Sequence, residues 1–277
     1  CKGVETMIHF MHRMLRLKNV TGRLVFWFFL LIFLSASLHL FSYTAIDRDK
    51  QINKTKLDLE HALTNQKIIM ESWANERMNE VRYLANLPAT KKLQLDQMAH
   101  TFQNFLKYHG ELESVVFLDH EGFVIIDSGQ DQALVQSDVT LKDRDYFIAA
   151  RQGKEYMHAV VTSRASEKPV IIFSVPLLSE SHQFQGVVFG AVHLSKVSEM
   201  LYQSLQGESG QVYLINDEGD VMTHVSKNGE QVLENQTLAA DFVEEIVNGE
   251  MAFSSYENHI GEEVFGSYVP LLDERYY

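Results

Sequence analysis

The sequence predicts an α+β fold in which an N-terminal transmembrane helix continues into a long helix, followed by two tandem α/β modules with antiparallel sheets. Leu24–Ile46 carries no formal charge and Asp47–Leu87 contains neither proline nor glycine, so both segments favour helix. After Gly110 the apolar residues change from helical spacing to short β-branched and aromatic runs. The segment Val116–Val124 then recurs as Tyr213–Val221 at an offset of 97 residues, which indicates a repeated module.

The N-terminal region has the charge pattern of a membrane anchor. Residues 1–23 hold five lysines and arginines against one glutamate, and the uncharged segment 24–46 exceeds the about 20 apolar residues that span a bilayer. Because basic residues favour the cytoplasmic side, we expect residues 1–23 in the cytoplasm, a transmembrane helix at 24–46, and the remaining chain outside the plasma membrane. A signal peptide ending near Ser35–Ser37 and a lipoprotein attached through Cys1 are the alternatives.

Composition and motifs exclude several classes of function. The net charge of −13, without a basic patch, argues against nucleic acid as a partner. The single cysteine, Cys1, rules out an intrachain disulfide. No GxSxG, HExxH, P-loop or GxGxxG motif is present, so we expect no catalytic residue, no cofactor and no metal site in this segment.

The segment 47–87 is predicted to be a long stalk helix. Its apolar residues fall near a seven-residue spacing that Gln66, Arg77 and Glu80 interrupt. This pattern fits a helix that packs partly on its own domain and partly on a second copy, which predicts a homodimer through this helix. Packing against the sheet alone is the alternative. The apolar positions are Ile52, Leu59, Leu63, Met70, Trp73, Leu84 and Leu87.

A first α/β module is expected at residues 88–197. Pro88 ends the stalk helix, residues 91–108 form an amphipathic helix, and Gly110 is its C-cap. Alternating and β-branched runs then predict about five strands, of which the first two form a hairpin. These runs are Ser114–Ser128 (the hairpin), Tyr156–Arg164, Pro169–Leu178 and Gly186–Ser195, and a short helix at Val197–Leu205 follows them.

Between the hairpin and the later strands lies Leu141–Phe147, which precedes a short helix that ends at Gly153. Arg144 is the candidate ligand contact, because the planar guanidinium matches a carboxylate with two parallel hydrogen bonds. Tyr146 and Phe147 are candidates for the walls of the pocket around it. The alternative is a surface Asp–Arg pair at the start of a helix.

Two further matches support the repeat. Ile148–Gly153 corresponds to Glu244–Gly249 at an offset of 96, and Ser174–Leu178 corresponds to Tyr268–Leu272 at an offset of 94. Three matches in the same order, with slowly drifting spacing, favour two copies of one module over chance turns. The second copy is therefore expected at residues 198–277.

The two copies differ in ways that assign them different roles. Arg144 of the first stands where the second has Ala240, so we expect the ligand in the first module. The strand Gly186–Ser195 has no counterpart in the second copy, which predicts a truncated second sheet and a chain that is the front part of a longer protein.

This organisation resembles the double-Cache sensor domains of bacterial signalling receptors. The resemblance covers about residues 50–277 and is carried by DRDYF (Asp143–Phe147), LDHEG (Leu118–Gly122) and KPVIIFSVPL (Lys168–Leu177) followed by GVVFGAVHLS (Gly186–Ser195). It implies two PAS-like modules outside the inner membrane, the membrane-distal one (88–197) binding a small molecule and the membrane-proximal one (198–277) leading to an output domain beyond these residues. Such output domains are those of chemoreceptors, histidine kinases and diguanylate cyclases.

The resemblance also implies which residues contact the ligand. The arginine and aromatic positions are Arg144, Tyr146 and Phe147, and the positions on the following strands are Val161, Ser163 and His193, with His158 as a further candidate.

The amino-acid-binding branch of this family has a tyrosine where this chain has Val139 and aspartates where it has Ser163 and His193. Because an ammonium group buried without an acid is costly, we expect a carboxylate or another small anion as the ligand. An extracytoplasmic binding protein without cytoplasmic output is the alternative function, and a secreted hydrolase on this scaffold is a third that no motif supports.

Overall fold

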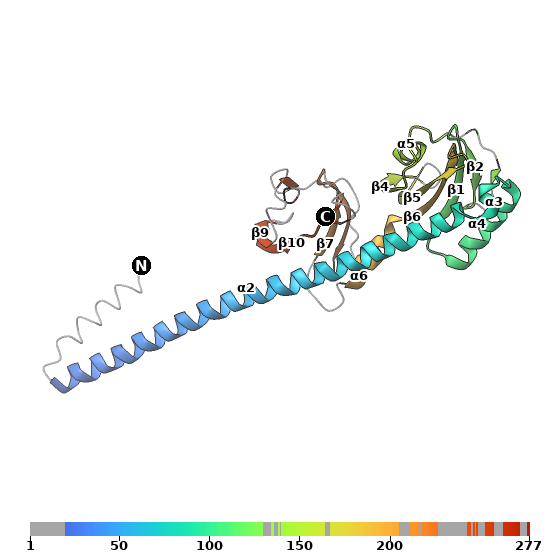
Figure 1. The fold of residues 1–277 in the computed structure, drawn as a ribbon. Coiled ribbons are helices and arrows are strands. Elements are labelled where there is room, and N and C mark those ends of the chain that lie inside the picture. Colours follow the sequence, from blue (N-terminus) through green and yellow to red (C-terminus); the bar gives the residue numbers. More distant parts are fainter. Residues whose placement is uncertain are drawn as a thin grey trace. The chain divides into compact units, whose positions relative to one another are not determined.

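The computed structural model describes most of the chain (Figure 1). The described residues are 20–129, 134, 135, 138, 140–163, 167–204, 211–216, 218–226, 243, 244, 246, 248, 253–257, 263–271, 276 and 277. By its internal contacts the chain divides into two compact units, Cys1–Asp58 and Leu59–Tyr277, and each is described by itself.

Helix α2 spans Val20–Ala85 and contains the predicted stalk segment almost completely. The predicted end is correct to within two residues, and Pro88 instead begins the short helix α3 (Pro88–Lys91), where its missing N–H costs nothing. In the first unit the large apolar side chains between Leu24 and Leu38 are mostly exposed. Within the part of the chain that the structure describes, no helix has both the length and the apolar character required to cross a membrane.

Helix α4 (Leu95–His109) is amphipathic, as predicted, and begins four residues later than expected. It ends at Gly110, whose φ of 55° and N–H bond to the Leu106 carbonyl form a left-handed C-cap. Met98 and Phe102 are completely buried on its inner side. The C-cap prediction for Gly110 is therefore confirmed.

The second unit contains an antiparallel sheet of six strands in the order β3-β2-β1-β6-β5-β4 (Figure 1). The sequence predicted about five of these strands, and β3 is the additional one. β6 ends at His193, and helix α6 begins directly after it, so the helix starts earlier than predicted. The bounds are β1 Ser114–Asp119, β2 Val124–Asp127, β3 Leu134–Val135, β4 Tyr156–Thr162, β5 Pro169–Leu178, β6 Phe184–His193 and α6 Leu194–Ser204.

The two faces of this sheet bury different cores, because neighbouring residues of a strand point to opposite faces. On one face Phe173 and Val188 pack with α2 and α4. On the other face Leu118, Val187 and Phe189 pack with helix α5 (Asp145–Arg151). Complete burial of one such side chain contributes about 1.5–3 kcal/mol, so both helical layers are held mainly by apolar contact. We call the α5 side the α5 face and the other the α2 face.

The described strands that follow α6 form two two-stranded antiparallel sheets, β7 with β8 and β9 with β10. Their bounds are β7 Gln211–Ile215, β8 Val221–Ser226, β9 Phe253–Glu257 and β10 Glu263–Ser267.

The β7–β8 hairpin repeats the β1–β2 hairpin in detail. Asp119 Oδ1 accepts the N–H groups two and four residues later, and Asn216 Oδ1 does the same in the second hairpin. Gly122 and Gly219 occupy the same turn position with φ of 91° and 87°, values that favour glycine. Each hairpin also has a register shift in its first strand. The predicted recurrence of the hairpin is therefore confirmed.

Candidate functional site

Arg144 lies at the start of α5, on the α5 face of the sheet. Its backbone is extended, with φ of −82° and ψ of 138°, and its carbonyl accepts the N–H groups of Phe147 and Ile148, so the helix begins immediately after it. The half-buried side chain reaches the edge strand β4, where Nη2 donates a long 3.4 Å hydrogen bond to the carbonyl of Thr162. Arg144 thereby links the beginning of α5 to the end of β4.

Tyr146 and Phe147 lie in the core beneath α5. Their side chains are only 3 % and 1 % exposed. The Tyr146 ring lies 5.1 Å from that of Phe189 and the Phe147 ring lies 5.7 Å from that of Phe184, both measured between centroids. The two aromatic side chains thus hold α5 on the sheet, and their contact with a ligand stays a prediction.

The candidates from the later strands share the α5 face with Arg144. Val161 of β4 and His193 of β6 both pair with Val170 of β5, so the three residues form one row across the sheet. Ser163 follows β4 directly, is half-buried, and donates its N–H to the carbonyl of Lys168. The structure therefore brings the backbone positions of these candidates to one end of one face.

One candidate and one further position from the sequence analysis are less completely described. His158 pairs with Ile172 in the ladder between β4 and β5, and its side chain lies outside the described part of the structure. Val139, which stands at the tyrosine position of the amino-acid-binding branch, also lies outside the described residues.

Glu113 is a residue of this site that the sequence argument missed. Its carboxylate Oε1 lies 3.0 Å from Nε2 of His193, and each side chain is about one quarter exposed. The N–H of Glu113 donates to the carbonyl of Ala191, which fixes this residue beside the end of β6. An acid therefore does stand next to His193, although Ser163 and His193 themselves occupy the positions where the amino-acid-binding branch has aspartates.

Asp127 is a carboxylate on the α5 face. It pairs with Val116, whose side chain belongs to the core on that face. Burial raises the pKa of Asp127, and the N–H of Gly129, which donates to Oδ1 at 3.0 Å, partly offsets this shift. Asp127 thus adds a group on this face that ionises less readily than an exposed aspartate.

The opposite face of the sheet carries a small apolar cavity. Trp73 of α2 lines it together with Met157 and Ile171 of the sheet. The cavity is on the α2 face, whereas Arg144 is on the α5 face. Among the described residues, no group of histidines, cysteines and carboxylates is arranged to hold a metal ion.

Residues 46–276 match a family model that is described as a Cache domain. No curated protein sequence matches the chain significantly. Among solved structures, the sensory domain of the Campylobacter jejuni chemoreceptor Tlp3 with isoleucine bound has a TM-score of 0.59 and 17 % identity, covering 78 % of this chain and 88 % of that one.

The ligand-binding domain of the same chemoreceptor with 4-methylisoleucine gives a TM-score of 0.61 at 16 % identity, over 78 % of this chain and 86 % of that one. The sensor domain of the V. cholerae histidine kinase DctB gives 0.60 at 12 % identity, over 82 % of this chain and 96 % of that one. At these identities the likeness shows a shared fold.

Proposed function

Because this chain belongs to the family of Cache domains, we propose that it is the extracytoplasmic sensor of a bacterial signal-transduction receptor and binds a small organic anion. A Cache domain is a sensory, ligand-binding domain and not a catalytic one. The anion binds in the membrane-distal module, residues 88–197, and the membrane-proximal module, residues 198–277, passes the change to an output domain of a chemoreceptor, histidine kinase or diguanylate cyclase.

The observation that carries this proposal is the placement of Arg144. Its guanidinium stands at the start of α5 and donates a 3.4 Å bond to a neutral carbonyl, that of Thr162. A carboxylate is the better acceptor, because its negative charge attracts the guanidinium and its two oxygens can accept two parallel hydrogen bonds. An anion at this end of the α5 face therefore replaces a weak contact with a strong one. Val161, Ser163 and His193 are the neighbouring positions for the rest of the ligand.

A zwitterionic α-amino acid is a second candidate ligand, and Glu113 is the observation that favours it. The Tlp3 structures contain isoleucine and a derivative of it. In this chain the carboxylate of Glu113 lies 3.0 Å from Nε2 of His193, and it offers a partner for an ammonium group. A simple carboxylate uses Arg144 alone, whereas an amino acid uses both charges.

The membrane anchor and the dimer belong to the same proposal. We place residues 1–23 in the cytoplasm, a single membrane-spanning helix at 24–46, and the stalk 47–87 with both modules outside the inner membrane. The exposed apolar side chains between Leu24 and Leu38 support this, because a lipid environment suits them better than water. Leu57, Ile68 and Ile69 are also exposed on α2, which fits a homodimer through this helix.

A thermal-shift screen of the 277-residue chain in detergent micelles tests the proposed ligand class. We expect a small carboxylate or an α-amino acid to raise the unfolding temperature, since a ligand that binds only the folded state stabilises it by about 2.7 kcal/mol at a hundredfold excess over Kd. Glu113→Gln separates the two candidate ligands, because it should weaken the binding of an amino acid and leave the binding of a simple carboxylate unchanged. A screen in which neither class stabilises the chain contradicts the proposal.

A further inference from the structure

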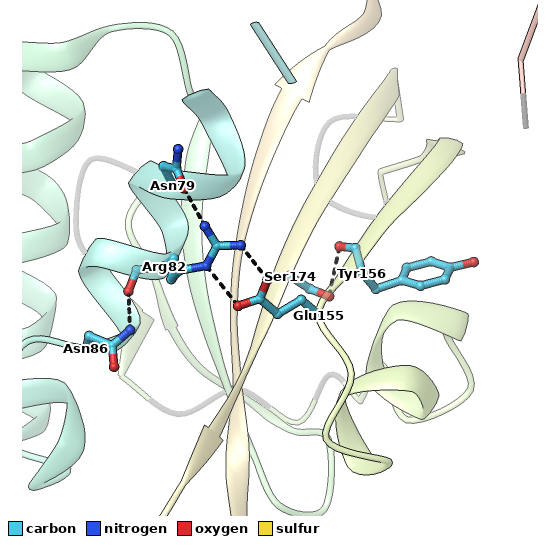
Figure 2. A network of polar contacts seen from close by, with 6 residues as sticks. All are labelled: Asn79, Arg82, Asn86, Glu155, Tyr156 and Ser174. Carbon is cyan, nitrogen blue, oxygen red and sulfur yellow. Dashed lines mark hydrogen bonds and ion pairs between the residues drawn. The ribbon is translucent and has the colours of Figure 1, made fainter. Parts of the chain in front are cut away.

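The C-terminal end of α2 is joined to the beginning of β4 by a two-point ion pair (Figure 2). Arg82 Nε donates to Glu155 Oε1 at 2.9 Å, and Arg82 Nη2 donates to Glu155 Oε2 at 2.5 Å. Glu155 is the residue immediately before β4, so this pair holds the start of that strand to the long helix. The two residues are 73 positions apart in the sequence.

Arg82 is held in place for this contact by its own helix. Asn79 Oδ1 accepts a hydrogen bond from the third guanidinium nitrogen, Nη1, and Asn86 Nδ2 donates to the carbonyl of Arg82 at 2.8 Å (Figure 2). All three guanidinium nitrogens therefore have partners. Arg82 and Glu155 are 43 % and 39 % exposed, so solvent limits the contribution of the pair to stability, and its two-point geometry also fixes the position of Glu155 relative to α2.

Strand β4 connects this ion pair to the proposed anion contact. Glu155 precedes its first residue, and Thr162, whose carbonyl accepts the bond from Arg144, is its last. β4 is an edge strand, paired in the sheet with β5 and with no strand on its other side in the described part of the chain. A register shift between His158 and Val161 interrupts the β4–β5 ladder. Such a strand moves more easily than the central strands β1 and β6.

We propose that β4 transmits a change in the hydrogen bonding of Arg144 to α2 through the ion pair between Glu155 and Arg82. An anion that takes the N–H groups of Arg144 changes the bond to Thr162 at one end of the strand. The other end, at Glu155, then shifts against Arg82, and α2 follows because its guanidinium is fixed to the helix. This relay rests on the proposed function, since it takes Arg144 as the contact of the ligand.

The relay is testable without a ligand, by hydrogen–deuterium exchange on the 277-residue chain in detergent micelles. Arg144→Ala removes the bond to Thr162, and we expect amide exchange at the end of α2, residues 79–85, to rise about two- to fivefold. In a Glu155→Ala background the same substitution leaves exchange in α2 unchanged. The charge swap Arg82→Glu with Glu155→Arg restores the response.

A matched control lies on the same helix. Lys67 and Glu71 form a partly exposed ion pair at 3.7 Å, and both of its residues belong to α2. Glu71→Ala should leave the response of α2 to Arg144→Ala intact. If α2 responds equally in the Glu155→Ala background, or does not respond in the otherwise native chain, the relay is wrong.

These outcomes are independent of the ligand screen. If an anion binds but Arg144→Ala does not change exchange in α2, only the relay is contradicted. If Arg144→Ala changes exchange in α2 as predicted but no carboxylate and no amino acid binds, only the proposed function is contradicted.

Discussion

The contact between α2 and the centre of the sheet depends on Gly190 in β6, and Gly190→Ala is the sharpest test of this packing. A Cβ at this position would lie 2.8 Å from Val81 Cγ2 and 3.0 Å from Leu112 Cδ2. Carbon atoms in contact are normally about 3.5–4.0 Å apart, so α2 has to move outward by about 1 Å. Val81 is completely buried and branched at Cβ, which leaves it little freedom to turn aside.

Overpacking of this kind costs about 1–3 kcal/mol of unfolding free energy. In a domain of this size each kcal/mol lowers the unfolding temperature by about 2–4 °C, so we expect a fall of about 2–12 °C in a thermal melt followed by circular dichroism. Val81→Ala in the Gly190→Ala chain should recover part of the loss, with a coupling of about 0.5–3 kcal/mol.

Gly153→Ala is the matched control for this experiment. Gly153 has φ of 76° and open space around its Cα, so alanine there is strained by its backbone conformation alone. Val81→Ala should not relieve that strain. An unchanged melting temperature for Gly190→Ala, or strictly additive effects with Val81→Ala, would refute the close packing of α2 on β6.

Three further predictions concern the sheet and its carboxylates. Gly186→Ala should lower the unfolding free energy by about 3 kcal/mol or more in a urea titration, because its Cβ would lie 2.1 Å from the carbonyl oxygen of Leu118; a loss below 1 kcal/mol would contradict this geometry. Asp127→Asn should stabilise the protein at pH 7 and have no effect at acid pH, since burial raises the pKa of Asp127 and protonation removes the cost of its charge; a destabilised variant would count against this. The hydrogen bonds from Arg82 hold the pKa of Glu155 below its usual value, so their stabilisation is present above the unfolded pKa of Glu155 and disappears as the pH falls through the folded one. Thermal melts between pH 6 and pH 3 should therefore show a smaller fall in unfolding temperature for Arg82→Gln than for the native chain. Equal falls would disprove the coupling between protonation of Glu155 and stability.

Local sequence signals predicted the parts of the fold that depend on neighbouring residues. The helix-ending role of Gly110 and the turns at Gly122 and Gly219 follow from backbone conformations that glycine adopts readily. The resemblance to double-Cache sensor domains, based on the order of the elements and on short motifs in the first hairpin, around Arg144 and in the later strands, is confirmed by the family match over residues 46–276. β3 was missed because two residues, Leu134–Val135, are too few to show an alternating period.

The candidate site was harder to predict because it depends on contacts between distant strands. Glu113 meets His193 only because β1 pairs with β6, a strand that follows it by about 70 residues and lies between β1 and β5 in the sheet. The ion pair between Arg82 and Glu155 has the same origin. No local pattern marks either carboxylate, whereas Arg144 stands out because its neighbours carry a motif.

Isothermal titration with the anion that the thermal-shift screen selects tests the central claim most directly. The comparison is between the native chain, Arg144→Ala and Arg151→Ala, the last removing an exposed arginine from the other end of the same helix. Losing a hydrogen-bonded charge from a binding site costs about 1.5–3 kcal/mol, so Kd should rise about 10- to 150-fold for Arg144→Ala and remain native for Arg151→Ala. Equal affinity of the Arg144→Ala and native chains would contradict the claim that this guanidinium binds the ligand.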